Sequence, residues 1–295
     1  MLAADIVSGG EQSASMMRPI GARNSFMESK ARVLLNKLDA GKPVFGVTML
    51  SPSPELVEIL AYVGMDFVIV DQMFTPIDWH ELRQMVRAAR GSDLVVLGRV
   101  ENNPWYGGDD LGVTARAARA MGVGCDGVKV HVYSATQAKA VMETAKDWHR
   151  NVHITPFAPD GFTGVASERA ENVLVIPGVE SKRGIEDTPE ILQIDGLRIF
   201  AIAMTDTAIV LGHPMDYEHQ DVWRFVDETV GEAKSKGIDI CAGTGYMFRS
   251  WDEITGRVDR MLNHGIRMIF VQTPEFLLQL TMSDLVSRLT RIVNP

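Results

Sequence analysis

Residues 172–206 read NVLVIPGVESKRGIEDTPEILQIDGLRIFAIAMTD, and this stretch decides the fold. Its two ends, residues 172–180 and 197–204, are runs of apolar and β-branched side chains with the length of strands. The segment between them contains PEIL, a helix candidate. A strand, a helix and a second strand in this order predict two parallel strands joined by a crossover helix.

The same alternation continues outward in both directions, from about residue 24 to the end of the sequence. Because the strand runs are continuously apolar, we expect strands buried on both faces, as in a closed (β/α)₈ TIM barrel of the α/β class. An open doubly wound sheet is the alternative, but no GxGxxG motif follows the first strand. The eight strand candidates are VFGVTML (44–50), FVIVDQ (67–72), LVVLGRV (94–100), GVKVHV (127–132), NVLVIPGVE (172–180), LRIFAIAM (197–204), IDICAGTG (238–245) and MIFVQT (268–273).

We expect one barrel domain over residues 24–295, preceded by a flexible N-terminal arm over residues 1–23. One connection differs from the others: residues 151–171, between the fourth and fifth strands, are rich in Pro, Gly and Thr and longer than a typical loop. A loop of this kind at the mouth of a barrel is usually functional or a lid.

The composition excludes several classes of partner. The formal net charge of −9 offers no basic surface for nucleic acid or for anionic lipid. The first residues lack the apolar core of a signal peptide, and no later run has the length of a membrane span, so we expect a cytoplasmic protein without a membrane partner. Cys125 and Cys241 lie in or beside apolar runs without CxxC spacing, which favours two buried thiols.

Two acidic residues follow neighbouring strand runs: Glu180 ends the fifth, and Asp206 follows the sixth. Since barrel enzymes carry their active sites at the carboxyl ends of the strands, these carboxylates should converge there. Converging carboxylates repel one another unless a proton or a cation lies between them, and a hard cation such as Mg²⁺ or Mn²⁺ suits oxygen ligands. The alternative is that Glu180 pairs with Lys182 or Arg183 on the surface and that Asp206 caps a helix.

Arg99 lies near the end of the third strand run, where a charged side chain is costly unless it meets an anion. It could hold a substrate carboxylate or an enolate oxygen, or it could form an internal salt bridge with Asp71 or Glu101. Trp105, just beyond it, could shape the substrate pocket or simply pack within its loop.

Lys129 and His131 share one face of the fourth strand run, which makes them candidates for proton transfer. The alternative for His131 is a histidine packed at the barrel rim. An ammonium group on a barrel strand needs either solvent at the mouth or a carboxylate partner.

Several motifs together resemble a known family, from about Asn24 to the end of the chain. The motifs are FVIVDQMFTPID, LGRV, GVKVHVYSATQAKA, PDGFTG and VES…DTPEILQIDGLRIFAIAMTDTAIVLGHP. The most specific of them is the last, a strand ending in Glu, a helix, and a strand followed by Asp and a Leu-Gly turn. With these motifs the sequence looks like the class II pyruvate aldolases of the 4-hydroxy-2-oxoheptanedioate aldolase and citrate lyase β-subunit superfamily.

The resemblance implies a divalent-metal-dependent carbon–carbon lyase that acts on a small 2-oxo acid through a metal-stabilised pyruvate enolate. Glu180 and Asp206 match the family's metal ligands, and Arg99 matches its arginine at the pyruvyl group. The resemblance also implies a homo-oligomer, a hexamer or trimer, with the last helix exchanged between subunits. The PDGFTG loop could help to bind the substrate carboxylate through Gly161, Thr163 and Gly164.

One departure from the family lies after the second strand. Where family aldolases carry Glu-His, with the histidine assigned to proton transfer, residues 71–74 read Asp-Gln-Met-Phe, and Phe74 cannot accept a proton. Another group such as His131 or Lys129 could supply the base. The reaction could instead be a decarboxylation or hydration on the same metal platform, or the chain could be a catalytically silent 2-oxo-acid-binding protein.

Overall fold

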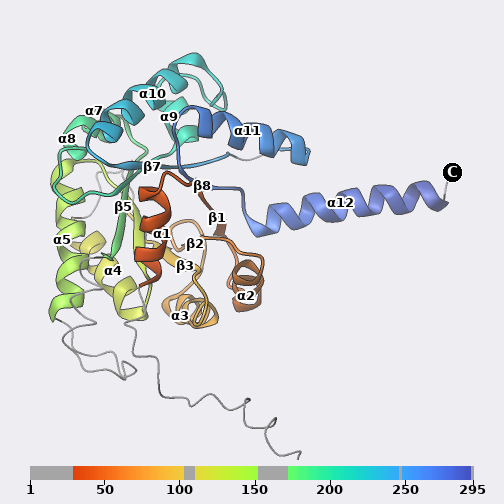
Figure 1. Cartoon of the computed structure of the whole chain (residues 1–295), viewed down its shortest axis with the longest axis horizontal. Coiled ribbons are helices and arrows are strands. Elements are labelled where there is room, and N and C mark those ends of the chain that lie inside the picture. Colours follow the sequence, from red (N-terminus) through yellow and green to blue (C-terminus); the bar gives the residue numbers. More distant parts are fainter. Residues whose placement is uncertain (1–28, 103–109, 152–171, 246–247, 294–295) are drawn as a thin grey trace, which may run out of the picture.

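The computed structural model describes residues 29–102, 110–151, 172–245 and 248–293, and these form a closed barrel of eight parallel strands. Each strand pairs with the next in sequence, and β8 pairs with β1 (Figure 1). The predicted barrel is therefore confirmed, with a strand in each of the eight runs. The strands are β1 Val44–Met49, β2 Phe67–Asp71, β3 Val95–Arg99, β4 Gly127–His131, β5 Leu174–Val179, β6 Ile199–Ile202, β7 Asp239–Gly243 and β8 Met268–Phe270.

The strands have two apolar faces because a barrel wall is covered on both sides. One face packs against the helices. The other fills the barrel interior with every second residue of a strand, for example Phe67 and Ile69 in β2 and Val95 and Leu97 in β3. Buried residues of α1 (Lys30–Asp39) belong to the same interior cluster, so this helix closes the amino end of the barrel.

The helices begin where their N-terminal N–H groups find acceptors. In α3, the Asp78 side chain accepts from the N–H of Glu81, and the Glu81 side chain accepts from the N–H of Asp78. Besides α1, the helices are α2 Pro54–Tyr62, α3 Trp79–Ala88, α4 Asp110–Val123, α5 Ala135–Asn151, α7 Lys182–Glu186, α8 Thr188–Ile191, α9 Met204–Val210, α10 Gln220–Ser235, α11 Trp251–Asn263 and α12 Pro274–Val293.

The C-terminal helix α12 extends away from the barrel (Figure 1). It is 20 residues long, and none of its residues is buried. Apolar side chains are exposed along it, namely Leu278, Met282, Leu285, Val286, Leu289, Ile292 and Val293. Within the described part of the chain, no helix combines the length and hydropathy that crossing a membrane requires.

Two further sequence predictions concern the cysteines and the N-terminal arm. Cys125 and Cys241 are both buried free thiols, as predicted. The N-terminal arm over residues 1–23 lies outside the described residues, so the division of the chain at residue 24 stays a prediction.

Candidate active site

The strand alternation that fills the barrel interior also aims charged side chains into its carboxyl end. Asp71 continues the inward positions of β2 after Phe67 and Ile69, and Arg99 continues those of β3. At this end lies a cavity of about 320 Å³. Its charged and titratable lining residues are Asp71, Arg99, Lys129, His131, Glu180 and Asp206.

Arg99 joins two carboxylates across the barrel. Its Nη1 lies 3.0 Å from Oδ2 of Asp71, and its Nη2 lies 3.0 Å from Oε1 of Glu180. The other Asp71 oxygen, Oδ1, accepts from the backbone N–H groups of Met73 at 2.8 Å and Phe74 at 3.1 Å. Of the two internal partners considered for Arg99, the structure therefore places Asp71 beside it. Fixed in this way, the guanidinium holds positive charge in the cavity.

A short chain of contacts runs from Lys129 through His131 to Glu180. Nζ of Lys129 lies 2.9 Å from Nε2 of His131, and Nδ1 of His131 lies 2.8 Å from Oε1 of Glu180. An ammonium group only donates, so Nε2 accepts, and the imidazole proton is on Nδ1 facing Glu180. The contact between Nδ1 of His131 and Oε1 of Glu180 has the length of a hydrogen bond but not its direction. Nδ1 therefore has no hydrogen-bond partner among the described residues.

The surroundings of Lys129 and His131 shift the pKa values of both side chains. Burial holds the pKa of His131 well below its ordinary value, and the positive charges of Lys129 and Arg99 lower it further, so the imidazole is neutral. Lys129 is only 5% exposed, and burial followed by repulsion from Arg99 lowers its pKa to about 8. The ammonium of Lys129 can therefore release its proton near neutral pH.

Asp206 lies in the first turn of α9 and lines the same cavity as Glu180. Burial, and then the negative charge of Glu180, raise its pKa to about 6. Burial also raises the pKa of Glu180, against the effect of Arg99. Among the described residues, no Lys, Arg or His pairs with Asp206, whereas Lys182 pairs with Glu186 rather than with Glu180. The charges of Arg99 and Lys129 lower the pKa of Asp206 without forming an ion pair with it. Two carboxylates that line one cavity, one of them without an ion-pair partner among the described residues, fit a divalent metal ion with oxygen ligands.

Phe74 stands where the family resemblance places a histidine. Its ring lies over the Arg99 guanidinium, 4.8 Å from Cζ to the ring centroid, and it lines the cavity while 70% exposed. Its exposure places it at the mouth. The position therefore offers an apolar surface and no proton acceptor.

The cavity also contains residues that sequence reasoning missed. Phe270 and Gln272, in and just after β8, face the charged residues from the other side of the barrel. They lie at the end of the eighth strand run, so the rule of reading strand ends could have found them, but both are uncharged and drew no attention. The remaining predicted substrate-binding residues, Trp105, Gly161, Thr163 and Gly164, lie outside the described residues.

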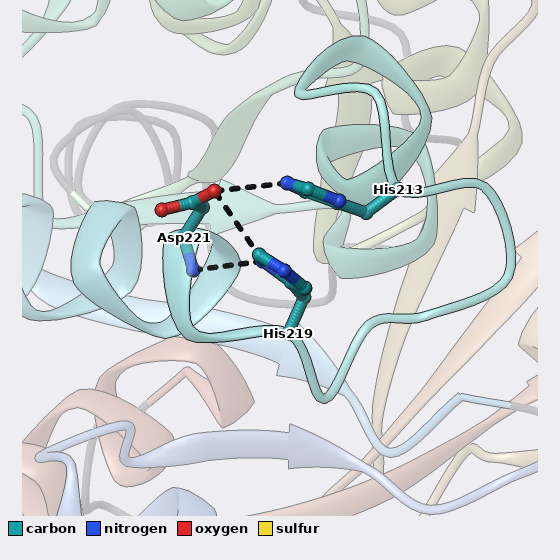
Figure 2. A group of neighbouring side chains, drawn as sticks. All are labelled: His213, His219 and Asp221. Atoms are coloured by element: carbon teal, nitrogen blue, oxygen red, sulfur yellow. Dashed lines mark hydrogen bonds and ion pairs between the residues drawn. The ribbon is translucent and has the colours of Figure 1, made fainter.

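A second cluster of potential metal ligands, none of which lines the cavity, lies at the N-terminal end of α10 (Figure 2). His213 Nε2 lies 2.9 Å from Oδ2 of Asp221, and Nδ1 of His219 accepts from the Asp221 N–H at 3.2 Å. The two imidazole rings stack at 3.4 Å with 16° between their planes. Because an imidazole lone pair lies in the plane of its ring, lone pairs in two stacked, nearly parallel planes do not meet at one ion. These contacts instead cap α10 and hold the loop before it.

A parallel barrel with its charged residues gathered at the carboxyl end of the strands places this chain among the TIM-barrel proteins with a site at that end. The family HpcH/HpaI aldolase/citrate lyase matches residues 45–271, and the chain belongs to this family. Its members are class II aldolases and lyases that act on 2-oxo acids and typically depend on a divalent metal. The family resemblance seen in the sequence is thus confirmed.

Individual relatives are distant. The 2-dehydro-3,6-dideoxy-6-sulfogluconate aldolase of Pseudomonas putida is 23% identical over 223 residues, 70% of this chain and 81% of that protein. The 5-keto-4-deoxy-D-glucarate aldolase of Salmonella paratyphi A is 24% identical over 200 residues, 63% of this chain and 71% of that protein. An HpcH/HpaI aldolase structure from Desulfitobacterium hafniense superposes with a TM-score of 0.75 at 23% identity, covering 87% of this chain and 96% of that one.

Proposed function

We propose that this protein is a divalent-metal-dependent carbon–carbon lyase of the aldolase type acting on a 2-oxo acid. One observation carries the proposal: Glu180 and Asp206 crowd two carboxylates into one cavity, next to Arg99, while Asp206 has no cationic partner among the described residues. This donor set suits Mg²⁺ or Mn²⁺. When bound, such an ion supplies Lewis-acid charge to the oxygens of a 2-oxo acid.

Arg99 contributes positive charge from the protein itself. A guanidinium has five N–H groups, and Asp71 and Glu180 occupy one each. Its Nε is buried without a hydrogen-bond partner among the described residues. Donors that remain can stabilise the negative charge that develops on the 2-oxo oxygen during carbon–carbon cleavage.

Lys129 is our candidate for proton transfer, and His131 positions it. In cleavage, the neutral amine takes the proton of the substrate hydroxyl, the neighbouring carbon–carbon bond breaks, and its electron pair moves toward the 2-oxo group. The resulting ammonium then returns the proton to the carbon that lost its partner. A pKa of about 8 lets the Lys129 amine both take the proton and return it. Neutral His131 accepts a hydrogen bond from Lys129 without competing for that proton.

The test is release of pyruvate from a panel of 4-hydroxy-2-oxo acids, with Mg²⁺ or Mn²⁺ and with EDTA. We expect metal-dependent cleavage that Glu180→Gln and Asp206→Asn abolish, while the exposed Glu186→Gln serves as a matched control and cleaves normally. Cleavage that is unchanged by EDTA would refute the proposal. Carbon dioxide released from an oxaloacetate-like acid without aldol cleavage would identify a decarboxylase, and binding without turnover would identify a silent binding protein.

The proposal includes a homo-oligomer in which α12 packs on a neighbouring subunit. An isolated helix with a face of exposed apolar side chains gains little from its own chain, because none of its residues is buried. Contact with a second copy would remove that face from water.

A further inference from the structure

The cavity is divided by charge. The strands β2 to β6 and the segments after them supply its acidic and basic groups. The opposite side, from β7 through β8 to β1, has no charged side chain among the described lining residues. The lining residues on that side are Thr48, Leu50, Gly243, Gly245, Phe270 and Gln272. A 2-oxo acid held by the charged groups therefore has an uncharged wall facing the rest of its structure.

Gln272 on this wall has an unusual backbone. Its φ is +67°, in the left-handed region that favours glycine, and Gln272 as a whole is only 2% exposed. A buried side chain in this conformation costs conformational free energy that a glycine would not. Such costs are concentrated at binding and catalytic sites. A glutamine kept at this position therefore suggests a role for its side-chain amide, which glycine lacks.

The orientation of the amide follows from its one hydrogen-bond partner among the described residues. Nε2 of Gln272 donates to the backbone carbonyl of Gly245, and a carbonyl accepts only, so the nitrogen must face it. Oε1 is then the free end. It is buried and has no hydrogen-bond partner among the described residues, although buried polar atoms nearly always have one. The cavity that Gln272 lines is where a donor can come from.

We propose that Oε1 of Gln272 accepts a hydrogen bond from a neutral donor, a hydroxyl group, on the part of the substrate beyond the hydroxyl that reacts in carbon–carbon cleavage. This assignment rests on the proposed function. A carboxylate at that place has no proton to donate and would face the partial negative charge of Oε1, while one of the two N–H groups of Nε2 is already engaged by the carbonyl of Gly245. The site therefore selects 2-oxo acids with an uncharged, hydroxyl-bearing tail over those with a second carboxylate.

The test compares four ligands by calorimetry on the full chain with Mn²⁺: pyruvate, 4,5-dihydroxy-2-oxopentanoate, 4-hydroxy-2-oxohexanoate and 4-hydroxy-2-oxoglutarate. The last three share the reacting 4-hydroxyl. The second and third differ by a methyl group in place of the 5-hydroxyl, and the fourth has a carboxylate at that place. Titrations are read before measurable pyruvate forms. The wild type should bind the dihydroxy acid about tenfold more tightly than 4-hydroxy-2-oxohexanoate, and 4-hydroxy-2-oxoglutarate should bind more weakly than either.

Gln272→Gly removes the amide and suits the backbone, so it should fold, and it should bind 4,5-dihydroxy-2-oxopentanoate and 4-hydroxy-2-oxohexanoate equally. The matched control is Met215→Gly, at the other described non-glycine residue with positive φ, which is exposed and does not line the cavity. This control should keep the wild-type preference. If the wild type shows no preference, or if Gln272→Gly retains it, the assignment of Gln272 is overturned while pyruvate binding leaves the proposed function standing. If not even pyruvate binds, both fail.

Discussion

Replacing Arg99 with methionine should destabilise the protein strongly, and more so at high pH. The Arg99 side chain is 11% exposed, and it lies 3.0 Å from a carboxylate oxygen of Asp71 and 3.0 Å from one of Glu180. Removing one partner of a buried ion pair costs about 3–5 kcal/mol, because the remaining charge stays buried. Two backbone N–H groups still bind Asp71, so most of the loss falls on Glu180.

The sign of the pH dependence follows from Glu180. Burial raises its pKa and Arg99 lowers it, so the pKa rises further in Arg99→Met. An acid with a raised pKa in the folded state loses stability as the pH rises from its unfolded-state pKa to its folded-state pKa, and the penalty is absent below both, where the proton is bound in both states. The deficit relative to wild type should therefore be larger at pH 8 than at pH 5.

The assay is urea unfolding of both proteins in EDTA at the two pH values. The control is Lys139→Met, which breaks an exposed ion pair with Glu143 and should cost no more than about 1 kcal/mol. If Arg99→Met were no less stable than this control, or if its deficit were the same at pH 5 and pH 8, the description of Arg99 as the cation between buried carboxylates would be refuted.

Further predictions concern the metal, the proton and the C-terminal helix. Because the pKa of Asp206 is raised to about 6, protons compete with the cation, and calorimetry should show Mn²⁺ affinity falling about tenfold per pH unit below pH 6; equal affinities at pH 5 and pH 7 would contradict this. With Lys129 as the base, kcat/KM should rise with pH up to about 8, and Lys129→Met should lose at least about a hundredfold in rate together with that dependence; a variant that keeps the wild-type pH profile rules Lys129 out. Removing residues 274–295 should reduce the mass seen by light scattering, and an unchanged mass would show that α12 is not an oligomer contact.

Most of the fold could be predicted from the sequence, because each barrel strand is marked by its own apolar run. The alternation within a strand also places Arg99 correctly, since it follows Val95 and Leu97 on the inward side. Glu180 and Asp206 were found by the rule that functional residues follow strand ends. These inferences need only local pattern and the common topology of parallel barrels.

The contacts that give the site its chemistry could not be predicted in this way. That Lys129 donates to His131, and that Arg99 joins Asp71 to Glu180, depends on distances across the barrel. Gln272 is a still clearer case. Its positive φ has no signature in the sequence, and its place opposite the charged residues exists only because β8 closes against β1.

The central claim is that Glu180 and Asp206 together hold one divalent cation that binds a 2-oxo acid. Anomalous diffraction from a crystal soaked with Mn²⁺ and pyruvate tests it most directly. We predict one strong peak within about 2.0–2.3 Å of an oxygen from each carboxylate, with pyruvate completing the coordination on the side of Arg99. No peak between the two carboxylates at saturating Mn²⁺, or pyruvate bound elsewhere in the barrel, would contradict the claim.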